Sequence, residues 1–420
     1  MSNIKSRKVL GAVAAVAAAS LAVGVSMPAN AAGAADKTLK ITSILPLTGA
    51  LAFLYPPMEA GANLAIEDIN AAGGVLGNKV EFTSLDSGDG NNLAVSTQSA
   101  TQAIADGTDV VLGAAASGVT RNIINQITGA GIVEISPSNT APDLSTWNDN
   151  GFYFRTAPSD NLQGRIIANQ ILQDGAQNVA ILYANNSYGT GLLNVAKSQL
   201  TKSGATVKAY SFPEGETNFG SVVAKVTASK PDAVLIISYD EAKKAIPALK
   251  AAKYPAGQLY FVDGNTVDYS KQSFGKYLRG AQGTIPGAKA TSAFASRLSA
   301  EYAKLHPGQV LGDMTYAAES YDAVVLVALA AEAAGAATGA GVKSQLTNVS
   351  LAGKGKVTVT GFAAGLKAIT AGKQVNYDGF SGPIEFDKNG DPTGAFIGIY
   401  KYNANGKNKL ARTVAGNSVK

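Results

Sequence analysis

The sequence has no cysteine among its 420 residues. This absence excludes disulfide bonds, thiolate metal sites and thiol nucleophiles, and it also excludes a lipid-modified cysteine after a signal peptide. A chain of this length needs no disulfides, because it can bury a large apolar core, and the length predicts about two or three domains. With 46% hydrophobic and 15% charged residues, the composition is that of a globular protein.

Histidine is nearly absent as well. The one histidine, His306, precedes Pro307 at the end of a predicted helix, where a surface side chain is expected. A Ser–His–acid triad or a histidine-based metal site would have only this residue to use. Glycine-rich phosphate-binding motifs are also missing, both Gly-x-Gly-x-x-Gly after the first predicted strand and Gly-x-x-x-x-Gly-Lys-Ser/Thr. We therefore expect no cofactor.

Two acidic loops permit a catalytic or metal-binding interpretation beside a structural one. Asp86 and Asp89 could form an acid pair or a cation loop, but a turn before a helix that begins near Asn92 is favoured. The run from Asp387 to Asp391 resembles the start of a calcium loop. Pro392 stands where that motif needs glycine, so a hairpin turn is favoured there.

Clustered charge is confined to the first residues. Basic residues at 5–8 precede an apolar run at 9–25 and a small-residue motif, which predicts a signal peptide at 1–31 cleaved after Ala31 or Ala35. An uncleaved membrane anchor is the alternative. Outside these first residues, the chain carries little of the +5 net charge, and its lysines are scattered. No nucleic-acid partner is therefore expected. We expect an exported protein of the periplasm or cell envelope without a lipid anchor.

From residue 38 onward, apolar strands alternate with amphipathic helices in two series. The first series has strands at 38–45, 79–85, 109–113 and 131–135 and helices at 57–72, 92–106 and 118–129; the second has strands at 178–184, 205–211, 232–238 and 258–262 and helices at 160–174, 189–203, 217–229 and 241–252. Such alternation predicts parallel strands joined by right-handed crossover helices. The fold class is therefore α/β, with two Rossmann-like lobes and a cleft between them.

The last third departs from this alternation. We predict helices at 289–305 and 315–334, a Gly/Thr/Lys-rich excursion at 335–360, a short helix at 361–371 and a hairpin that pairs Gly382–Asp387 with Ala395–Tyr402. Glu332 interrupts the apolar run in the second helix, whose length suits a buried helix rather than a membrane span.

Loops after the first-series strands carry candidate ligand contacts, because open α/β sheets bind ligands at the carboxyl ends of their strands. The first loop presents apolar side chains that look exposed, including Leu51, Leu54 and Tyr55. Ser117 could simply cap a helix, or it could offer an anion a hydroxyl at the positive end of the helix dipole. Ser136–Thr140 forms a second polar loop at the same sheet edge. Two adjacent loops with hydroxyl groups favour a carboxylate site.

The second series ends its strands in aromatic and acidic residues. Tyr188 and Tyr239 could wall a pocket or pack on their own helices, and Asp263 could cap its loop or face a bound ammonium. Hydroxyl groups on one lobe and a carboxylate on the other favour a zwitterionic ligand.

In this order, the loops resemble those of the periplasmic substrate-binding proteins of branched-chain amino acid ABC transporters, the leucine/isoleucine/valine-binding family. The resemblance covers about residues 38–405. It is carried by Leu45–Gly49, Gly61–Gly77, Ser136–Thr140, Ser187–Gly191 and Ser381–Phe396.

The resemblance implies roles for individual residues. Ser117 and Thr140 would bind the ligand carboxylate, with main-chain contacts from Ser138 and Asn139, and Asp263 would bind the ammonium. Tyr188 and Tyr239 would close over the ligand. Leu54, with Tyr55 beside it, would contact the ligand side chain, although Leu54 stands where the family has an aromatic residue.

The family fold implies two lobes that exchange the chain three times. The first lobe would comprise 37–157 plus 286–380 and the second 158–285 plus 381–420, with crossovers near Thr156–Ser159, Gly283–Pro286 and Phe380–Pro383. We therefore expect a monomeric, non-enzymatic protein that captures an amino acid or amide-like solute and delivers it to ABC permease subunits, contacting the membrane only through them. The alternatives are a ligand-sensing module and a secreted hydrolase that uses Asp86, Asp89 or Asp263.

Overall fold

The computed structural model describes residues 38–287 and 291–416, and the predicted signal peptide lies outside them. A five-stranded parallel sheet has the order β2-β1-β3-β4-β5. Its strands are Glu81–Asp86, Lys40–Leu45, Val110–Gly113, Val133–Ser136 and Tyr153–Arg155. Helices α1 (Tyr55–Ala71), α2 (Leu93–Ala105) and α3 (Ser117–Gly129) connect them. The first predicted series is confirmed.

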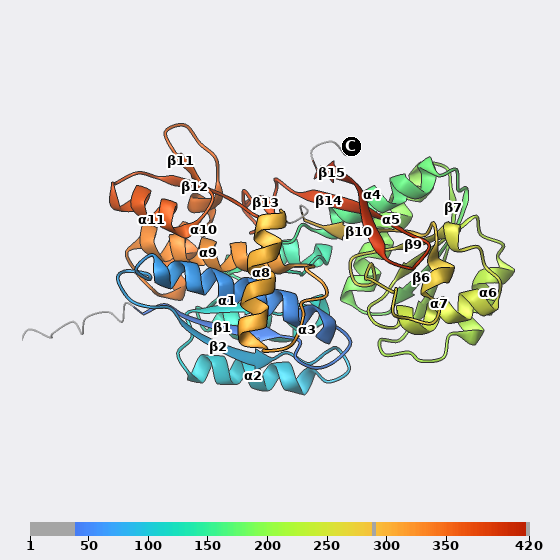
Figure 1. Ribbon diagram of the computed structural model, residues 1–420, viewed down its shortest axis with the longest axis horizontal. Coiled ribbons are helices and arrows are strands. Elements are labelled where there is room, and N and C mark those ends of the chain that lie inside the picture. Colours follow the sequence, from blue (N-terminus) through green and yellow to red (C-terminus); the bar gives the residue numbers. More distant parts are fainter. Residues whose placement is uncertain (1–37, 288–290, 417–420) are drawn as a thin grey trace, which may run out of the picture. The chain divides into compact units, whose positions relative to one another are not determined.

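A seven-stranded sheet has the order β15-β14-β10-β9-β8-β6-β7. Its strands in chain order are β6 (Asn178–Ala184), β7 (Thr206–Phe212), β8 (Ala233–Ile237), β9 (Leu259–Phe261), β10 (Gln282–Pro286), β14 (Phe396–Tyr402) and β15 (Asn408–Ala415). Helices α4 (Asp160–Gln173), α5 (Ser187–Lys202), α6 (Gly220–Ala228) and α7 (Ala242–Ala251) accompany it. We call the first sheet with its helices the first lobe, and the second sheet with α4–α7 the second lobe (Figure 1).

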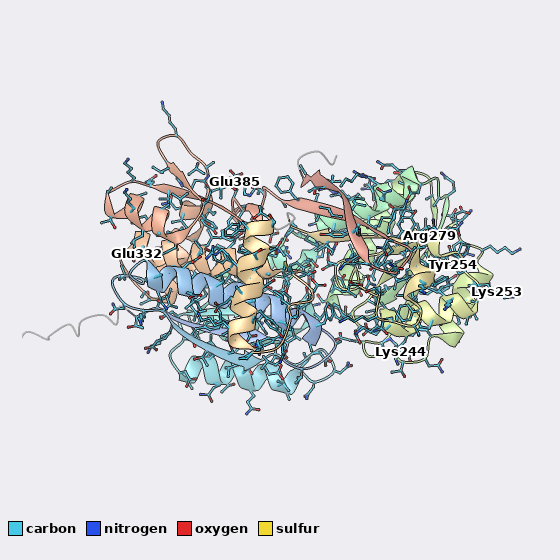
Figure 2. All side chains as sticks on the ribbon, viewed as in Figure 1. Lys244, Lys253, Tyr254, Arg279, Glu332 and Glu385 are labelled. Atoms are coloured by element: carbon cyan, nitrogen blue, oxygen red, sulfur yellow. The ribbon has the colours of Figure 1, made fainter. Side chains whose placement is uncertain are left out.

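The remaining helices pack on the first lobe. They are α8 (Ser292–Leu305), α9 (Ala317–Ala334), α10 (Gly339–Ser350) and α11 (Phe362–Thr370), with a small sheet of β11 (Val357–Val359), β12 (Val375–Gly379) and β13 (Gly382–Pro383). Helix α9 is buried along most of its length and packs against α1 and α10. At its end lies Glu332, which is labelled in Figure 2. Its carboxylate accepts a hydrogen bond of 2.6 Å from the Leu76 amide, which ties the turn after α1 to this helix.

No single helix among the described residues has the length and apolarity to cross a membrane. Helices α9 and α10 would pass that test only as a pair, and the two are bent by 105° with respect to each other. The prediction that the apolar run around Glu332 is a buried helix is confirmed.

Two predictions for the last third were wrong. Residues 382–387 do not pair with β14, which instead lies between β10 and β15. Its hairpin partner β15 follows a turn at Asn403, whose side chain accepts hydrogen bonds from the Asn405 and Lys407 amides. Strand β15 was not predicted from the sequence because it is an edge strand and largely exposed. The excursion at 335–360 contains α10, which buries Val342, Leu346 and Val349 at helical spacing.

The crossovers also differ in detail. The chain passes from β5 to α4 through residues 156–159. Residues 282–286 form the strand β10, so the chain leaves the second sheet after Pro286, at the end of the predicted crossover range. Residues 382–383 remain with the first lobe as β13, and the chain joins the second sheet at Phe396.

Candidate ligand-binding site

A small cavity of about 10 Å³ lies where loops of the two lobes meet. It is lined by Leu51, Leu54, Ala115, Ser117, Ser138, Thr140, Tyr188, Tyr239, Asp263, Gly264 and Tyr316. Most of these residues follow the carboxyl ends of strands, the edge at which open α/β sheets bind ligands. Most of the predicted site residues therefore converge on one cavity. Asn139 and Tyr55 do not line it.

Three hydroxyl groups stand on the first-lobe side. Ser117 is the first residue of α3 rather than its N-cap, which is Ala116. Its Oγ accepts a hydrogen bond of 3.3 Å from the Ala141 amide, while the Ser138 Oγ donates to the Ala115 carbonyl at 3.2 Å. Of the three, Ser117 lies at the start of a 13-residue helix, where the helix dipole favours a negative charge, and Ser138 and Thr140 line the same cavity from the loop after β4.

Asn139 stabilises the loop after β4 through hydrogen bonds, without lining the cavity. Its side-chain nitrogen donates to the carbonyls of Ala114 and Ala115, at 3.0 and 2.8 Å, and its amide donates to the Ser136 Oγ. The Asn139 Oδ1 accepts a hydrogen bond from the Tyr153 hydroxyl. The main-chain nitrogen of Asn139 is therefore engaged within the protein, and the Asn139 side chain fixes the loop that carries Ser138 and Thr140.

Buried Arg155 lies under the same loop. Its guanidinium binds the Asp391 carboxylate, with 2.6 Å between Nε and Oδ1, and donates to the main-chain carbonyls of Asn139 and Ala141 at 3.3 and 2.9 Å. Asp391 belongs to the acidic loop considered as a calcium site. Its carboxylate instead holds the arginine, while the Asp387 carboxylate accepts hydrogen bonds from loop amides.

Asp263 faces the hydroxyl groups from the second lobe. One of its oxygens accepts hydrogen bonds from the Tyr188 hydroxyl at 2.6 Å and the Gln163 amide at 2.8 Å. The other accepts one of 2.7 Å from the Tyr316 hydroxyl, which comes from the segment before α9 and thus from the first lobe. Burial raises the pKa of Asp263, and these donors oppose that shift by stabilising the carboxylate.

A second buried acid lies beside it. The Gln163 side-chain nitrogen also donates to Asp160 at 2.9 Å, so one amide bridges the two carboxyl groups. Asp160 Oδ2 is buried without a hydrogen-bond partner. Burial, and to a lesser extent the neighbouring Asp263, raises the pKa of Asp160 to about 8. The negative charge of this pair is not balanced by a lysine, arginine or histidine among the residues that line the cavity.

Sequence reasoning missed Asp160, Gln163 and Tyr316. The first two begin α4 directly after the first crossover, a position that itself suggests proximity to the cleft. Tyr316 follows an irregular segment, and its left-handed φ of 63° gave no sequence signal because glycine or asparagine would be expected there. Backbone strain of this kind occurs frequently at ligand sites.

Two stacked tyrosines form one wall. The rings of Tyr188 and Tyr239 are 5.1 Å apart and inclined by 12°. A side chain at Gly264 would collide with them, because its Cβ would lie 3.0 Å from the Tyr239 ring and 3.1 Å from the Tyr188 hydroxyl. Tyr188 and Tyr239 therefore line the cavity, which is the first of the two positions considered for them from the sequence.

The apolar wall comes from the first loop. Leu51 and Leu54 were expected to be exposed, but they are only 4% and 2% exposed because they point into the cavity and the core around it. Tyr55 begins α1 and donates its hydroxyl to the Glu59 carboxylate, away from the cavity. His306 contacts the other oxygen of Glu59, at 2.6 Å.

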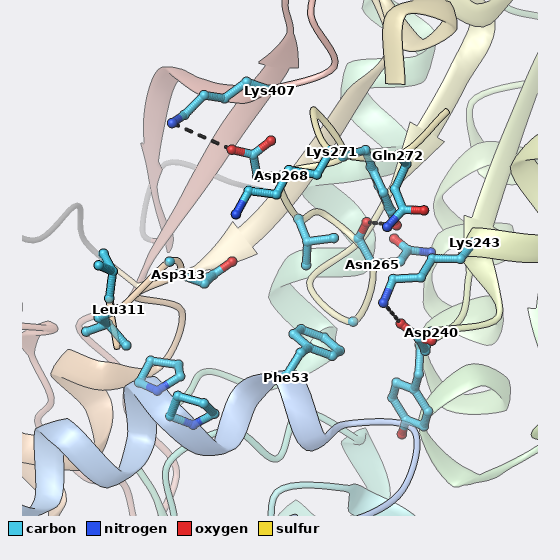
Figure 3. A pocket seen from close by; sticks show the side chains of 18 of the residues that line it. Phe53, Asp240, Lys243, Asn265, Asp268, Lys271, Gln272, Leu311, Asp313 and Lys407 are labelled. Carbon is cyan, nitrogen blue, oxygen red and sulfur yellow. Dashed lines mark hydrogen bonds and ion pairs between the residues drawn. The ribbon is translucent and has the colours of Figure 1, made fainter. Parts of the chain in front are cut away.

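A wider groove adjoins the cavity across Tyr239 and Gly264, which line both. Figure 3 shows this groove, with Phe53 and Leu311 from the first lobe facing charged residues of the second. Lys243 pairs with Asp240, and Lys407 lies 3.6 Å from Asp268. The groove is the outer part of the same space between the lobes.

The acidic loop after β2 has a structural role. Asp86 accepts hydrogen bonds from the Thr48 amide and hydroxyl, and Asp89 accepts them from the amides of Ala50 and Asn91. Within residues 38–287 and 291–416, no group of three or more His, Cys, Asp or Glu side chains has the arrangement of a metal site.

Comparison with known proteins identifies the family. The model of the periplasmic binding protein family matches residues 38–407. The chain belongs to this family. Its similarity to Leu/Ile/Val-binding proteins confirms the resemblance to branched-chain amino acid ABC transporter substrate-binding proteins, and the solved structures confirm the α/β, two-lobed periplasmic binding protein type 1 fold.

Relatives of this periplasmic binding protein differ in how much of the chain they match. The Leu/Ile/Val-binding protein homolog 3 of Brucella melitensis is 30% identical over 210 residues, which are 50% of this chain and 56% of that protein. The chemotactic signal transduction system substrate-binding protein BasB of Halobacterium salinarum is 28% identical over 374 residues, 86% of this chain and 87% of that protein. The match to the Brucella protein thus spans little more than half of that relative.

Solved structures show the same fold with different ligands. The branched-chain amino acid transporter substrate-binding protein LivJ of Streptococcus pneumoniae, in complex with isoleucine, has a TM-score of 0.72 and 26% identity over 90% of this chain and all of its own. A solute-binding protein of Rhodopseudomonas palustris HaA2, in complex with p-hydroxybenzoic acid, has a TM-score of 0.73 and 16% identity over 90% of this chain and 97% of its own. The second likeness concerns the fold alone.

Proposed function

We propose that this protein is an exported substrate-binding protein of an ABC transporter that captures an amino acid with an aliphatic side chain and delivers it to a membrane permease. The observation that carries the proposal is the placement of opposite polar groups across one cavity. The hydroxyls of Ser117, Ser138 and Thr140 stand on the first lobe, and the Asp263 carboxylate stands on the second. This arrangement suits a ligand with a carboxylate at one end and an ammonium at the other.

The charge of the site favours a zwitterion over an aromatic acid. A benzoate-like ligand would bring a second negative charge close to Asp263 and Asp160, with no cationic side chain lining the cavity to balance it. An α-amino acid brings its own ammonium to this position. Asp263 then gains an opposite charge in a buried environment, where such a pair is strong.

The apolar wall supports an aliphatic side chain. Leu51, Leu54 and Ala115 provide a surface without polar side-chain atoms beside the polar groups. Transfer of a branched aliphatic group from water to such a surface is favourable by about 0.8 kcal/mol per buried CH₂. An amide or urea-like solute could use the hydroxyls and Asp263 but would leave this wall without a partner.

A sensory protein with the same binding chemistry is the second candidate. BasB, which matches 86% of this chain, is a substrate-binding protein of a chemotactic signal transduction system. The cavity would then serve the same ligand, and the partner would be a receptor instead of a permease.

Calorimetry with the full chain tests the proposal. We expect L-isoleucine to form a one-to-one complex and to be recovered unchanged. We expect propionamide and benzoate to bind at least about 100-fold more weakly, since neither has an ammonium to pair with the Asp263 carboxylate. Preferential binding of benzoate would contradict the zwitterion site. Conversion of the amide would instead support a hydrolase.

A further inference from the structure

A second contact between the lobes lies outside the ligand cavity. The Glu214 carboxylate, in the loop after β7, accepts a hydrogen bond of 3.0 Å from the Gly90 amide, in the loop after β2. Its other oxygen accepts one of 2.6 Å from the Asn186 side chain. Gly90 belongs to the first lobe, whereas Glu214 and Asn186 belong to the second.

This contact lies far from the crossovers between the lobes. In the first sheet, β2 is the edge strand farthest in strand order from β5, which leads into the first crossover. In the second sheet, β7 is the edge strand farthest from β10 and β14, which connect to the first lobe. A hinge motion about the crossovers therefore separates the loops after β2 and β7 more than the parts of the lobes near the crossovers.

The two loops fit closely. A Cβ at Gly90 would lie 2.6 Å from Glu214 Oε2, and a Cβ at Gly215 would lie 2.8 Å from Asn91 Nδ2. A side chain at position 90 would therefore require the Glu214 carboxylate to shift from its present position. Burial raises the pKa of Glu214, and the nearby Glu241 and Asp89 add to this, so the ionised group needs its two donors.

The contact is also connected to the ligand cavity. Asn186, which donates to Glu214, caps α5 by accepting a hydrogen bond of 2.9 Å from the Gly189 amide. The second residue of this helix is Tyr188, whose hydroxyl binds Asp263. Glu214 thus holds the end of the helix that carries one wall of the cavity.

We propose that Glu214 is a latch that holds the lobes closed through the Gly90 amide and thereby slows ligand release. It is a positioning residue, since it does not line the cavity. Its effect on ligand retention rests on the proposed function, but its effect on lobe closure can be measured without ligand.

The absence of cysteine makes the closure measurement direct. Gln98 on α2 and Lys225 on α6 are exposed, so Gln98→Cys and Lys225→Cys allow one spin label on each lobe. In ligand-free protein, we expect Glu214→Ala to shift the distance distribution toward longer distances. The control Glu216→Ala should not, because within the described part of the chain the Glu216 carboxylate accepts hydrogen bonds only from the Thr217 and Asn218 amides of its own loop. Equal distributions in wild type and Glu214→Ala would overturn the latch.

Gly90→Ala provides an independent test from the other lobe. The added Cβ would lie against the Glu214 carboxylate. We therefore expect Gly90→Ala alone to separate the lobes, and to have little effect on a protein that already carries Glu214→Ala. L-Isoleucine should dissociate about tenfold faster from either single variant. Additive effects of the two substitutions would contradict a direct contact. A wild type that binds no amino acid would contradict the proposed function, and the ligand-free distances would still decide the latch.

Discussion

Asp263 illustrates how one residue depends on its surroundings. Three side-chain donors already satisfy it, from Gln163, Tyr188 and Tyr316. All three donors are neutral, so they leave the charge of the ionised carboxylate uncompensated and it can still attract an ammonium. The tyrosines orient the acid, and the bound cation would balance it.

The hydroxyls of Ser117 and Thr140 provide a test at the residue scale. Hydrogen bonds to a charged group are worth about 1.5–3 kcal/mol each, so Ser117→Ala with Thr140→Ala should weaken L-isoleucine binding at least about 100-fold in calorimetry. Thr128→Ala, which removes a hydroxyl bonded to the Ile124 carbonyl near the other end of α3, should leave the affinity unchanged. An unchanged affinity in the double variant would exclude the carboxylate role.

Leu54 shows the reach and the limit of prediction from sequence at this scale. Its place after the first strand correctly indicated proximity to the cavity, but its exposure was misjudged. An apolar residue in a Pro/Gly loop looks exposed in isolation. It is buried here because residues of the second lobe, distant in sequence, cover the loop.

At the scale of elements, the buried pair of Arg155 and Asp391 joins β5 to the loop before β14. Arg155 is fully buried, and removal of its partner leaves an uncompensated charge in the interior. The loop that carries Ser138 and Thr140 depends on the same guanidinium through the carbonyls of Asn139 and Ala141.

Asp391→Asn should therefore lower the free energy of unfolding by about 3–5 kcal/mol, measured from urea denaturation. Lys243→Met, which breaks the exposed pair with Asp240, should change it by less than about 1 kcal/mol. Equal effects of the two substitutions would show that the buried pair has no special structural importance.

Regular α/β elements were predictable because their apolar periodicity is local. Helix α10 was not, since its three buried apolar residues stand among glycine, lysine and threonine, which are typical of loops. Strand β15 was not predictable either, because it is exposed and because its partner β14 was predicted to pair with residues 382–387. The loops of the site were found from strand ends, whereas Tyr316 depends on a long-range approach between lobes.

At the scale of the whole molecule, buried acids make stability depend on pH. Burial raises the pKa of Glu319 to about 8, and this residue lies beside the crossovers, where its carbonyl accepts a hydrogen bond from Thr156. The folded protein keeps a proton that the unfolded chain releases above about pH 4.3. Stability from this group is therefore complete below that pH and is lost as the pH rises toward 8.

Glu319→Gln should remove this loss, because the amide cannot ionise. Urea unfolding measured between pH 5 and 8 should give a less steep decline for the variant than for wild type, by up to about 1.4 kcal/mol per pH unit. Parallel pH profiles would show that Glu319 titrates alike in the folded and unfolded protein.

The central claim is that Asp263 binds the ammonium of a zwitterion, and one thermodynamic cycle tests it most directly. L-Isoleucine and 3-methylpentanoate, which lacks only the ammonium, are titrated by calorimetry into wild type and Asp263→Asn. We predict that wild type prefers isoleucine at least about 100-fold and that this preference falls below about tenfold in the variant. An equal preference in both proteins, or none in wild type, would contradict the account.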